Sequence, residues 1–130
     1  MDKKGDMASE DRNMRQKGRV AEDRAISYLE QLGLKFVTRN WYNGHAELDI
    51  IMEDDAFIRF IEVRSLEYPH SVEPFETINI RKQRHIIRAA GRFIAKYKIK
   101  KEAVFDVVSV VLKDGSFNIK YIANAFTPLW

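Results

Sequence analysis

The chain of 130 residues has no cysteine, only three prolines and no long hydrophobic run. The lack of cysteine excludes a disulfide framework, a cysteine nucleophile and thiolate zinc sites, and it fits a reducing cytoplasm, where we expect the protein. No apolar stretch reaches the roughly 20 residues of a membrane helix, and the N-terminus lacks the apolar core of a signal peptide. We therefore expect no membrane partner.

The composition that remains is that of a globular protein, with 45% hydrophobic residues and a net charge of +3. A chain of this length is expected to fold as one domain around one core. Residues 1–13 are polar and lack periodicity, which predicts a mobile tail before a folded domain at residues 14–130. Because the net charge is small, the distribution of charge is more informative about partners than the sum.

Hydrophobic periodicity predicts two helices and five strands. Helical spacing runs from about Met14 to Gly33 and from Asn79 to Tyr97. Strands are expected near residues 34–41, 44–52, 56–64, 103–112 and 117–122, with a proline-containing loop at 67–76. The order α-β-β-β-α-β-β predicts an α/β fold with a central sheet flanked by helices.

Two of the expected strands carry carboxylates where strands of a core are normally apolar. The first holds Glu47 and Asp49, and the second holds Glu62, followed by Arg64. An ionised carboxylate is costly to bury unless a cation compensates its charge. A divalent metal ion is therefore the leading explanation, and a buried salt bridge with Arg59 or Arg64 is the alternative.

The short segment between these strands, residues 53–56, predicts an antiparallel hairpin. We expect Glu62 to lie opposite Glu47. Any loop with an even number of residues places both acids on the same face as Asp49 and Arg64, whereas an odd loop would move Glu62 to the other face from Asp49. The metal-site hypothesis therefore requires an even loop.

The second helix carries what we call the cationic stripe, beside its apolar face. The stripe consists of Arg81, Arg84, Arg88, Arg92 and Lys96. Like charges at this spacing are mildly destabilising, which a phosphate backbone would relieve. The stripe indicates either a nucleic-acid contact or an ordinary solvated helix face.

A series of short motifs covers residues 17–126 with compatible spacing. They are Gly18, Ala21-Glu22, Ala25, Gly33, Asn40-Trp41, Glu47–Ile51, Phe60–Arg64, Lys82-Gln83, Phe105–Val108 and Asn124–Phe126. In this order they resemble the YraN-like family of uncharacterised bacterial proteins, which belongs to the PD-(D/E)XK nuclease superfamily. The resemblance implies a restriction-endonuclease-like fold, similar to that of Holliday-junction resolvases.

The resemblance also implies roles for individual residues. Asp49 and Glu62 would bind Mg²⁺ or Mn²⁺, with Glu47 as a third ligand or a rim acid. Glu22 resembles a helix acid that assists in some members, and otherwise it is a solvated side chain. Gln83 would position water or substrate.

The sequence departs from the superfamily pattern in two places. His45-Ala46 separates Gly44 from Glu47, so that the position of Glu47 is less well defined than that of Asp49. Arg64 stands where a lysine usually activates water. An arginine stays protonated and cannot act as a general base, although it can contact a phosphate.

We therefore expect a metal-dependent endonuclease that acts on DNA, including branched or otherwise structured DNA. The residues expected to contact nucleic acid are Arg64, Lys82, Arg84, Arg88 and Arg92. One alternative is a nucleic-acid-binding module with little or no cleavage, and another is a protein-interaction domain whose acids are structural. A homodimer would allow so small a protein to embrace a duplex.

Overall fold

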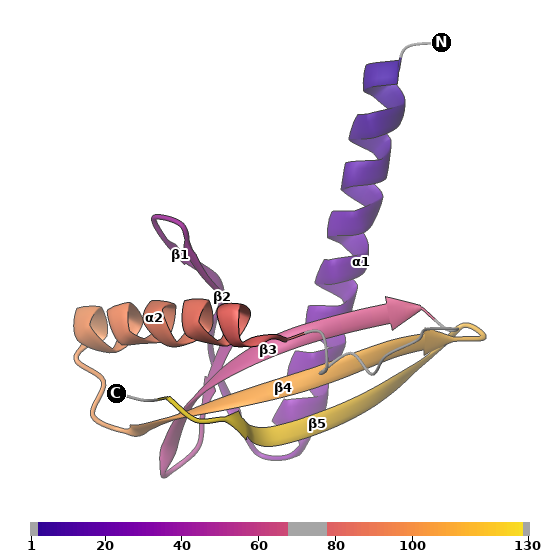
Figure 1. Ribbon diagram of the computed structural model, residues 1–130. Helices are drawn as coiled ribbons and strands as arrows, with labels where there is room; N and C mark the ends of the chain where they lie inside the picture. Colours follow the sequence, from indigo (N-terminus) through magenta and orange to yellow (C-terminus); the bar gives the residue numbers. More distant parts are fainter. Residues whose placement is uncertain (1–2, 68–77, 129–130) are drawn as a thin grey trace.

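A computed structural model describes residues 3–67 and 78–128, and describes side chains for residues 16–65 and 78–128. Over these residues the chain forms a mixed five-stranded sheet with one helix on each face (Figure 1). The elements are α1 (Lys3–Gln31), β1 (Lys35–Asn43), β2 (Ala46–Glu53), β3 (Phe57–Glu67), α2 (Ile80–Tyr97), β4 (Glu102–Lys113) and β5 (Ser116–Phe126). The expected order and α/β class are confirmed. The loop expected at 67–76 lies outside the described residues, except for Glu67, which ends β3.

The strands follow one another across the sheet in the order β1-β2-β3-β4-β5. β3 and β4 are parallel, and the other neighbours are antiparallel. A parallel pair needs a crossover connection, which α2 provides between β3 and β4. The first turn of α2 lies beside the middle of β3, where Lys82 Nζ is 3.6 Å from Glu62 Oε1.

Each face of the sheet has its own apolar core. The α2 core includes Ile51, Ile58, Phe60, Ile86, Phe93 and Phe105. The α1 core includes Ala25, Leu29, Ile50, Met52, Ile61 and Val108. Side chains alternate between the two cores along the central strands, as a sheet covered on both faces requires. The exception is β2, which rotates about its own axis.

β2 rotates at Asp49. Ile50 faces the α1 core and Ile51 the α2 core, but Leu48 also joins the α2 core, where regular alternation would place it with Ile50. Asn40 lies opposite Asp49 on β1 and has φ of +52°, a conformation that asparagine tolerates better than most residues. Helices on opposite faces can therefore both approach Asp49.

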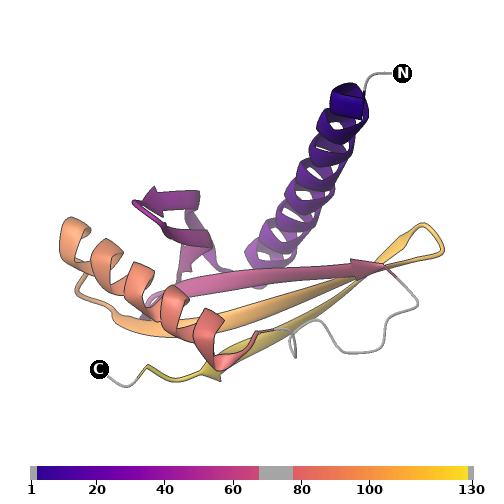
Figure 2. The same ribbon diagram turned by 45° about the horizontal axis from the view of Figure 1, so that its top comes forward.

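α1 begins at Lys3, so the helix expected from about Met14 starts earlier and includes residues 3–13, whose predicted mobility stays a prediction (Figure 2). The segment contains no proline, and six of its eleven residues are strong helix formers, namely Lys3, Lys4, Met7, Ala8, Glu10 and Arg12. Periodicity could not reveal it, because this half of α1 projects away from the sheet in both views and needs no apolar stripe. Neither α1 nor α2, over the parts described, is long and apolar enough to cross a membrane.

Candidate metal centre

A tight turn joins β2 to β3. The backbone N–H of Asp54 donates to the carbonyl of Phe57 (3.1 Å). Its Oδ1 accepts hydrogen bonds from the N–H groups of Ala56 (3.0 Å) and Phe57 (2.8 Å). These bonds close a loop of only Asp55 and Ala56, which is the side-chain-to-backbone turn typical of aspartate.

This turn sets the register of the acids. Ile50 pairs with Ile61, so the next pair along the hairpin is Asp49 with Glu62. The predicted register, with Glu62 opposite Glu47, is wrong. The partner of Glu62 is shifted by two residues, because the loop has two residues rather than four. Both loops are even, so the prediction that Asp49 and Glu62 share a face is confirmed.

The Asp49 and Glu62 carboxyl groups lie against each other in a buried place. Glu62 is only 5% exposed, and Asp49 Oδ2 accepts a hydrogen bond from the Val63 N–H (3.0 Å). Burial, together with the charge of Asp49, raises the pKa of Glu62 to about 8, although Lys82 and Arg64 oppose the shift. Burial also raises the pKa of Asp49. The two carboxyls lie close enough to interact directly, and their like charges favour the protonated form of Glu62.

Two cations approach Glu62 from different elements. Arg64 Nη2 and Lys82 Nζ each lie 3.6 Å from Glu62 Oε1, close enough for ion pairs but too long for good hydrogen bonds. Lys82 is in the first turn of α2, where its N–H donates to the side chain of the N-cap Asn79 (2.9 Å). Arg64 Nε is buried and has no hydrogen-bond partner among the residues that the structure describes. The alternative of a salt bridge between Glu62 and Arg64 is therefore present, but only as a long contact.

A third acid, Glu22, lies beside this pair on α1. Glu22 Oε2 accepts hydrogen bonds from Arg39 Nη2 (2.8 Å) and Asn40 Nδ2 (3.2 Å). The negative charge of Glu22 contributes to the raised pKa of Asp49, after the larger effect of burial. Asn40, Asp49 and Glu62 occupy consecutive positions on three neighbouring strands, and we call them the cross-strand row.

Sequence reasoning gave no role to Arg39 and named Asn40 only as part of a family motif. No local pattern links either residue to Glu22, because Asn40 and Glu22 are 18 positions apart and meet only when β1 packs against α1. The preference of asparagine for positive φ was the one available signal.

Two predicted site residues lie outside the row. Glu47 is exposed and accepts a hydrogen bond from the Tyr42 hydroxyl (3.3 Å). Gln83 Nε2 donates to the Ile78 carbonyl (3.3 Å) and so stabilises the start of α2. Among the residues whose side chains are described, no three carboxylate or histidine groups stand close enough together to hold a metal ion. The acids that meet are a pair, with Glu22 beside it.

The cationic stripe lies on the exposed surface of α2 as expected, opposite the buried Ile86, Ala89, Ala90 and Phe93. Arg92 Nη1 also donates to the Asn43 carbonyl of the β1–β2 hairpin (3.2 Å). Arg81, Arg84 and Arg88 of the stripe are exposed.

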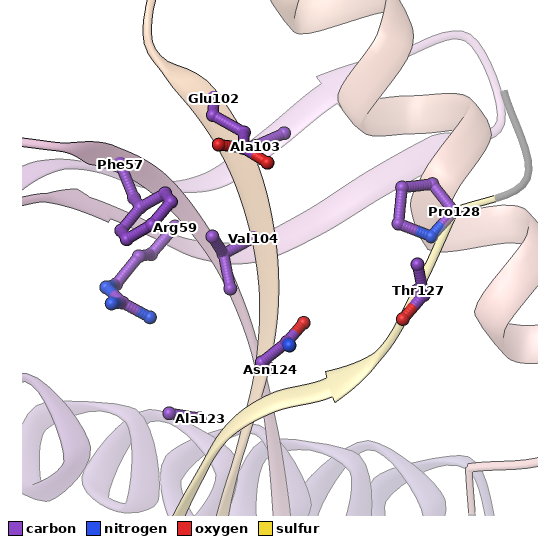
Figure 3. Close-up of a pocket in the computed structure, with 9 residues that line it drawn as sticks. All are labelled: Phe57, Arg59, Glu102, Ala103, Val104, Ala123, Asn124, Thr127 and Pro128. Carbon is purple, nitrogen blue, oxygen red and sulfur yellow. The ribbon is translucent and has the colours of Figure 1, made fainter.

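A pocket of about 560 Å³ lies away from the row, where β3 and β4 begin and β5 ends (Figure 3). Arg59 lines it and makes ion pairs with Asp54 (2.9 Å) and the fully buried Asp106 (3.1 Å). Asp106 also accepts hydrogen bonds from the Tyr121 hydroxyl and the Asn124 N–H. Asp106 thus has a structural role, and the pocket shares no residue with the row.

The sequence pattern of the uncharacterised protein family UPF0102 matches residues 21–110. Relatives that carry this family name include a protein from Persephonella marina, 39% identical over 111 residues that cover 85% of this chain and 92% of the relative. A protein from Legionella pneumophila (strain Corby) is 35% identical over 114 residues, covering 85% and 94%. One from Bacteroides thetaiotaomicron is 32% identical over 111 residues, covering 85% and 92%. The chain belongs to the UPF0102 family, which is the YraN-like family predicted from its motifs, so that prediction is confirmed.

Proposed function

We propose that this protein is a metal-dependent endonuclease with a restriction-endonuclease-like fold, acting on DNA that includes branched or otherwise structured forms. The observation that carries the proposal is that the buried Glu62 and the partly buried Asp49 meet across neighbouring strands. The element order and the mixed sheet agree with the fold that the sequence resemblance implies. Apolar residues at both positions would stabilise the fold. The presence of acids there therefore favours a chemical role.

The donor set suits a hard divalent cation such as Mg²⁺ or Mn²⁺, because both favour carboxylate oxygens. Asp49 and Glu62 would hold the ion, which would displace the proton that the raised pKa of Glu62 favours. Glu22, held by Arg39 and Asn40, would add a further negative charge. Such an ion polarises a phosphate and lowers the pKa of an attacking water.

In β3, arginine replaces the lysine that is usual in the superfamily, and Lys82 of α2 supplies an amine in its place. Arg64 stands at the usual lysine position and cannot take a proton from water. Lys82 approaches the same Glu62 oxygen from α2, at the same distance of 3.6 Å. In this proposal Lys82 orients the attacking water, and Arg64 contacts the phosphate.

The cationic stripe extends this site along α2. Because Lys82 is in the first turn of α2, Arg84 and Arg88 continue from the acids along an exposed surface. Arginines in such a row bind successive phosphates and make binding depend on salt. A second copy of the chain would supply a matching site for the other strand of a duplex.

Cleavage assays test the proposal. Labelled duplex, single-stranded and four-way DNA are incubated with the full chain and Mg²⁺ or Mn²⁺. We expect cleavage that Asp49→Asn or Glu62→Gln lowers by about 100-fold or more, with circular dichroism unchanged. Asp55→Asn, an exposed acid in the same hairpin, is the matched control and should cleave as the wild type does. Full activity in Asp49→Asn would refute the site.

One observation favours a second function, a nucleic-acid-binding module without cleavage. Arg64 replaces the usual lysine, and Lys82 approaches Glu62 without a short hydrogen bond. In that case DNA binds with the salt dependence of the cationic stripe, and neither cation gives cleavage.

A further inference from the structure

Tyr42 lies near the end of β1 and exposes 62% of its surface. Its neighbour Trp41 turns the other way and packs edge-on against Phe93 (5.3 Å between ring centroids) and Tyr97 (6.5 Å) of α2. Trp41 therefore anchors the hairpin, and Tyr42 does little for the core. A large exposed aromatic ring beside a candidate active site calls for a role in binding.

The end of the β1–β2 hairpin that presents Tyr42 is held in place. In addition to the packing of Trp41, Arg92 Nη1 of α2 donates a hydrogen bond to the carbonyl of Asn43 (3.2 Å). The ring is thus offered from a fixed backbone, which lowers the entropy lost when a ligand stacks on it.

Tyr42 stands at the rim of the cross-strand row. It pairs with Glu47 in the β1–β2 register, and its hydroxyl donates to Glu47 Oε1 (3.3 Å). Asn40, two residues earlier on the same strand, lies opposite Asp49. The charge of Glu47, followed by burial and the charges of Glu22 and Asp49, raises the pKa of Tyr42, as its place beside these acids requires.

We propose that the ring of Tyr42 is a stacking platform for an unstacked nucleobase next to the phosphate held at the cross-strand row. This inference rests on the proposed function and narrows its substrate to nucleic acid with unpaired bases, such as single strands, flaps and junctions. Proteins that bind single strands combine an aromatic platform with a cationic track, and here Tyr42 and the cationic stripe supply the two parts. The bases of a continuous duplex are stacked on each other and offer no free face unless one is flipped out.

Binding measurements with altered rings test the stacking directly. Fluorescence anisotropy compares a short labelled single strand with its duplex, using the full-length chain with Ca²⁺ in place of Mg²⁺. We expect Tyr42→Ala to weaken single-strand binding about tenfold and duplex binding less than about twofold. Tyr42→Phe and Tyr42→Trp keep a ring and should bind the single strand as the wild type does. Phe36→Ala, which removes a 43% exposed ring elsewhere on β1, is the matched control.

Single strands with one abasic position add a second measurement. At the position that stacks, loss of the base should weaken wild-type binding about tenfold and should leave Tyr42→Ala unaffected. If Tyr42→Ala binds the single strand as well as the wild type does, or loses duplex binding equally, the platform is refuted. In that event salt-dependent binding and metal-dependent cleavage would still support the nuclease. If the wild type binds no nucleic acid at all, both proposals fail.

Discussion

The Glu62 carboxyl gives the protein an unusual dependence of stability on pH. Burial and the charge of Asp49 raise its folded pKa to about 8, above the ordinary 4.5. Between these values the folded state binds more protons than the unfolded state, so the free energy of unfolding falls as the pH rises. We expect this loss from about pH 4.5 to about pH 8 in metal-free buffer with EDTA, and full stability below it.

Urea unfolding at a series of pH values measures this effect. Glu62→Gln cannot ionise and should show a flatter profile than the wild type over this range, whereas Glu47→Gln, an exposed acid, should not differ from the wild type. Identical profiles for Glu62→Gln and the wild type would mean that folding does not raise the pKa of Glu62.

Substitutions at Lys82 and Arg64 distinguish the roles of the two cations in cleavage. We expect Lys82→Met to lower kcat by about 100-fold with little change in DNA affinity, because it removes the amine at the acids. Arg64→Lys keeps a cation at the phosphate and should change kcat by less than about tenfold. Single-turnover cleavage measures both. If Lys82→Met cleaves DNA at the wild-type rate, Lys82 does not orient the attacking water.

At the same scale, the shared face of Asp49 and Glu62 could be predicted from strand alternation alone. Their direct opposition could not, because it depends on how Asp54 hydrogen-bonds within the turn. The contacts of Glu22 with Arg39 and Asn40 were also beyond prediction, since they join a helix to a strand through tertiary packing.

Among the elements, α2 carries the affinity for nucleic acid in this account. The double variant Arg84→Gln/Arg88→Gln should weaken DNA binding and lower the slope of log K against log salt by about two. Lys100→Gln, an exposed cation after the helix, serves as the control and should leave the slope within experimental error. An unchanged slope in the double variant would show that the stripe is only a solvated face.

The ends of β3, β4 and β5 are joined by the buried network around Asp106. Asp106→Asn should destabilise the fold by about 3 kcal/mol, because it weakens the buried ion pair with Arg59 and the bonds to Tyr121 and Asn124. Urea unfolding checks the loss against Asp114→Asn, an exposed turn acid. Metal affinity should persist in the folded fraction, because the network lies apart from the cross-strand row. A variant as stable as the wild type would contradict the structural role of Asp106.

The elements themselves were predictable because their apolar residues recur at helical or strand spacing. The N-terminal part of α1 was missed, since a helix that projects from the sheet carries no such stripe. The rotation of β2 at Asp49 was missed as well. Side chains alternate regularly between the two cores from Ile50 to Met52, and the alternation fails only before Asp49, at Leu48.

For the whole molecule, the α-β-β-β-α-β-β order and the single helix between β3 and β4 fix the mixed sheet, and both could be read from the sequence. The way in which three elements deliver Glu22, Asp49 and Lys82 to one place is a property of the assembled fold. That convergence is what the proposed function requires.

The central claim is that Asp49 and Glu62 together bind a divalent cation. Isothermal titration of Mn²⁺ into the full chain, with Mg²⁺ as competitor, tests it without a DNA substrate. We predict binding by the wild type and by Asp55→Asn, and its loss in Asp49→Asn and in Glu62→Gln. Equal Mn²⁺ affinity in the wild type and Asp49→Asn, or no binding by the wild type, would contradict the account.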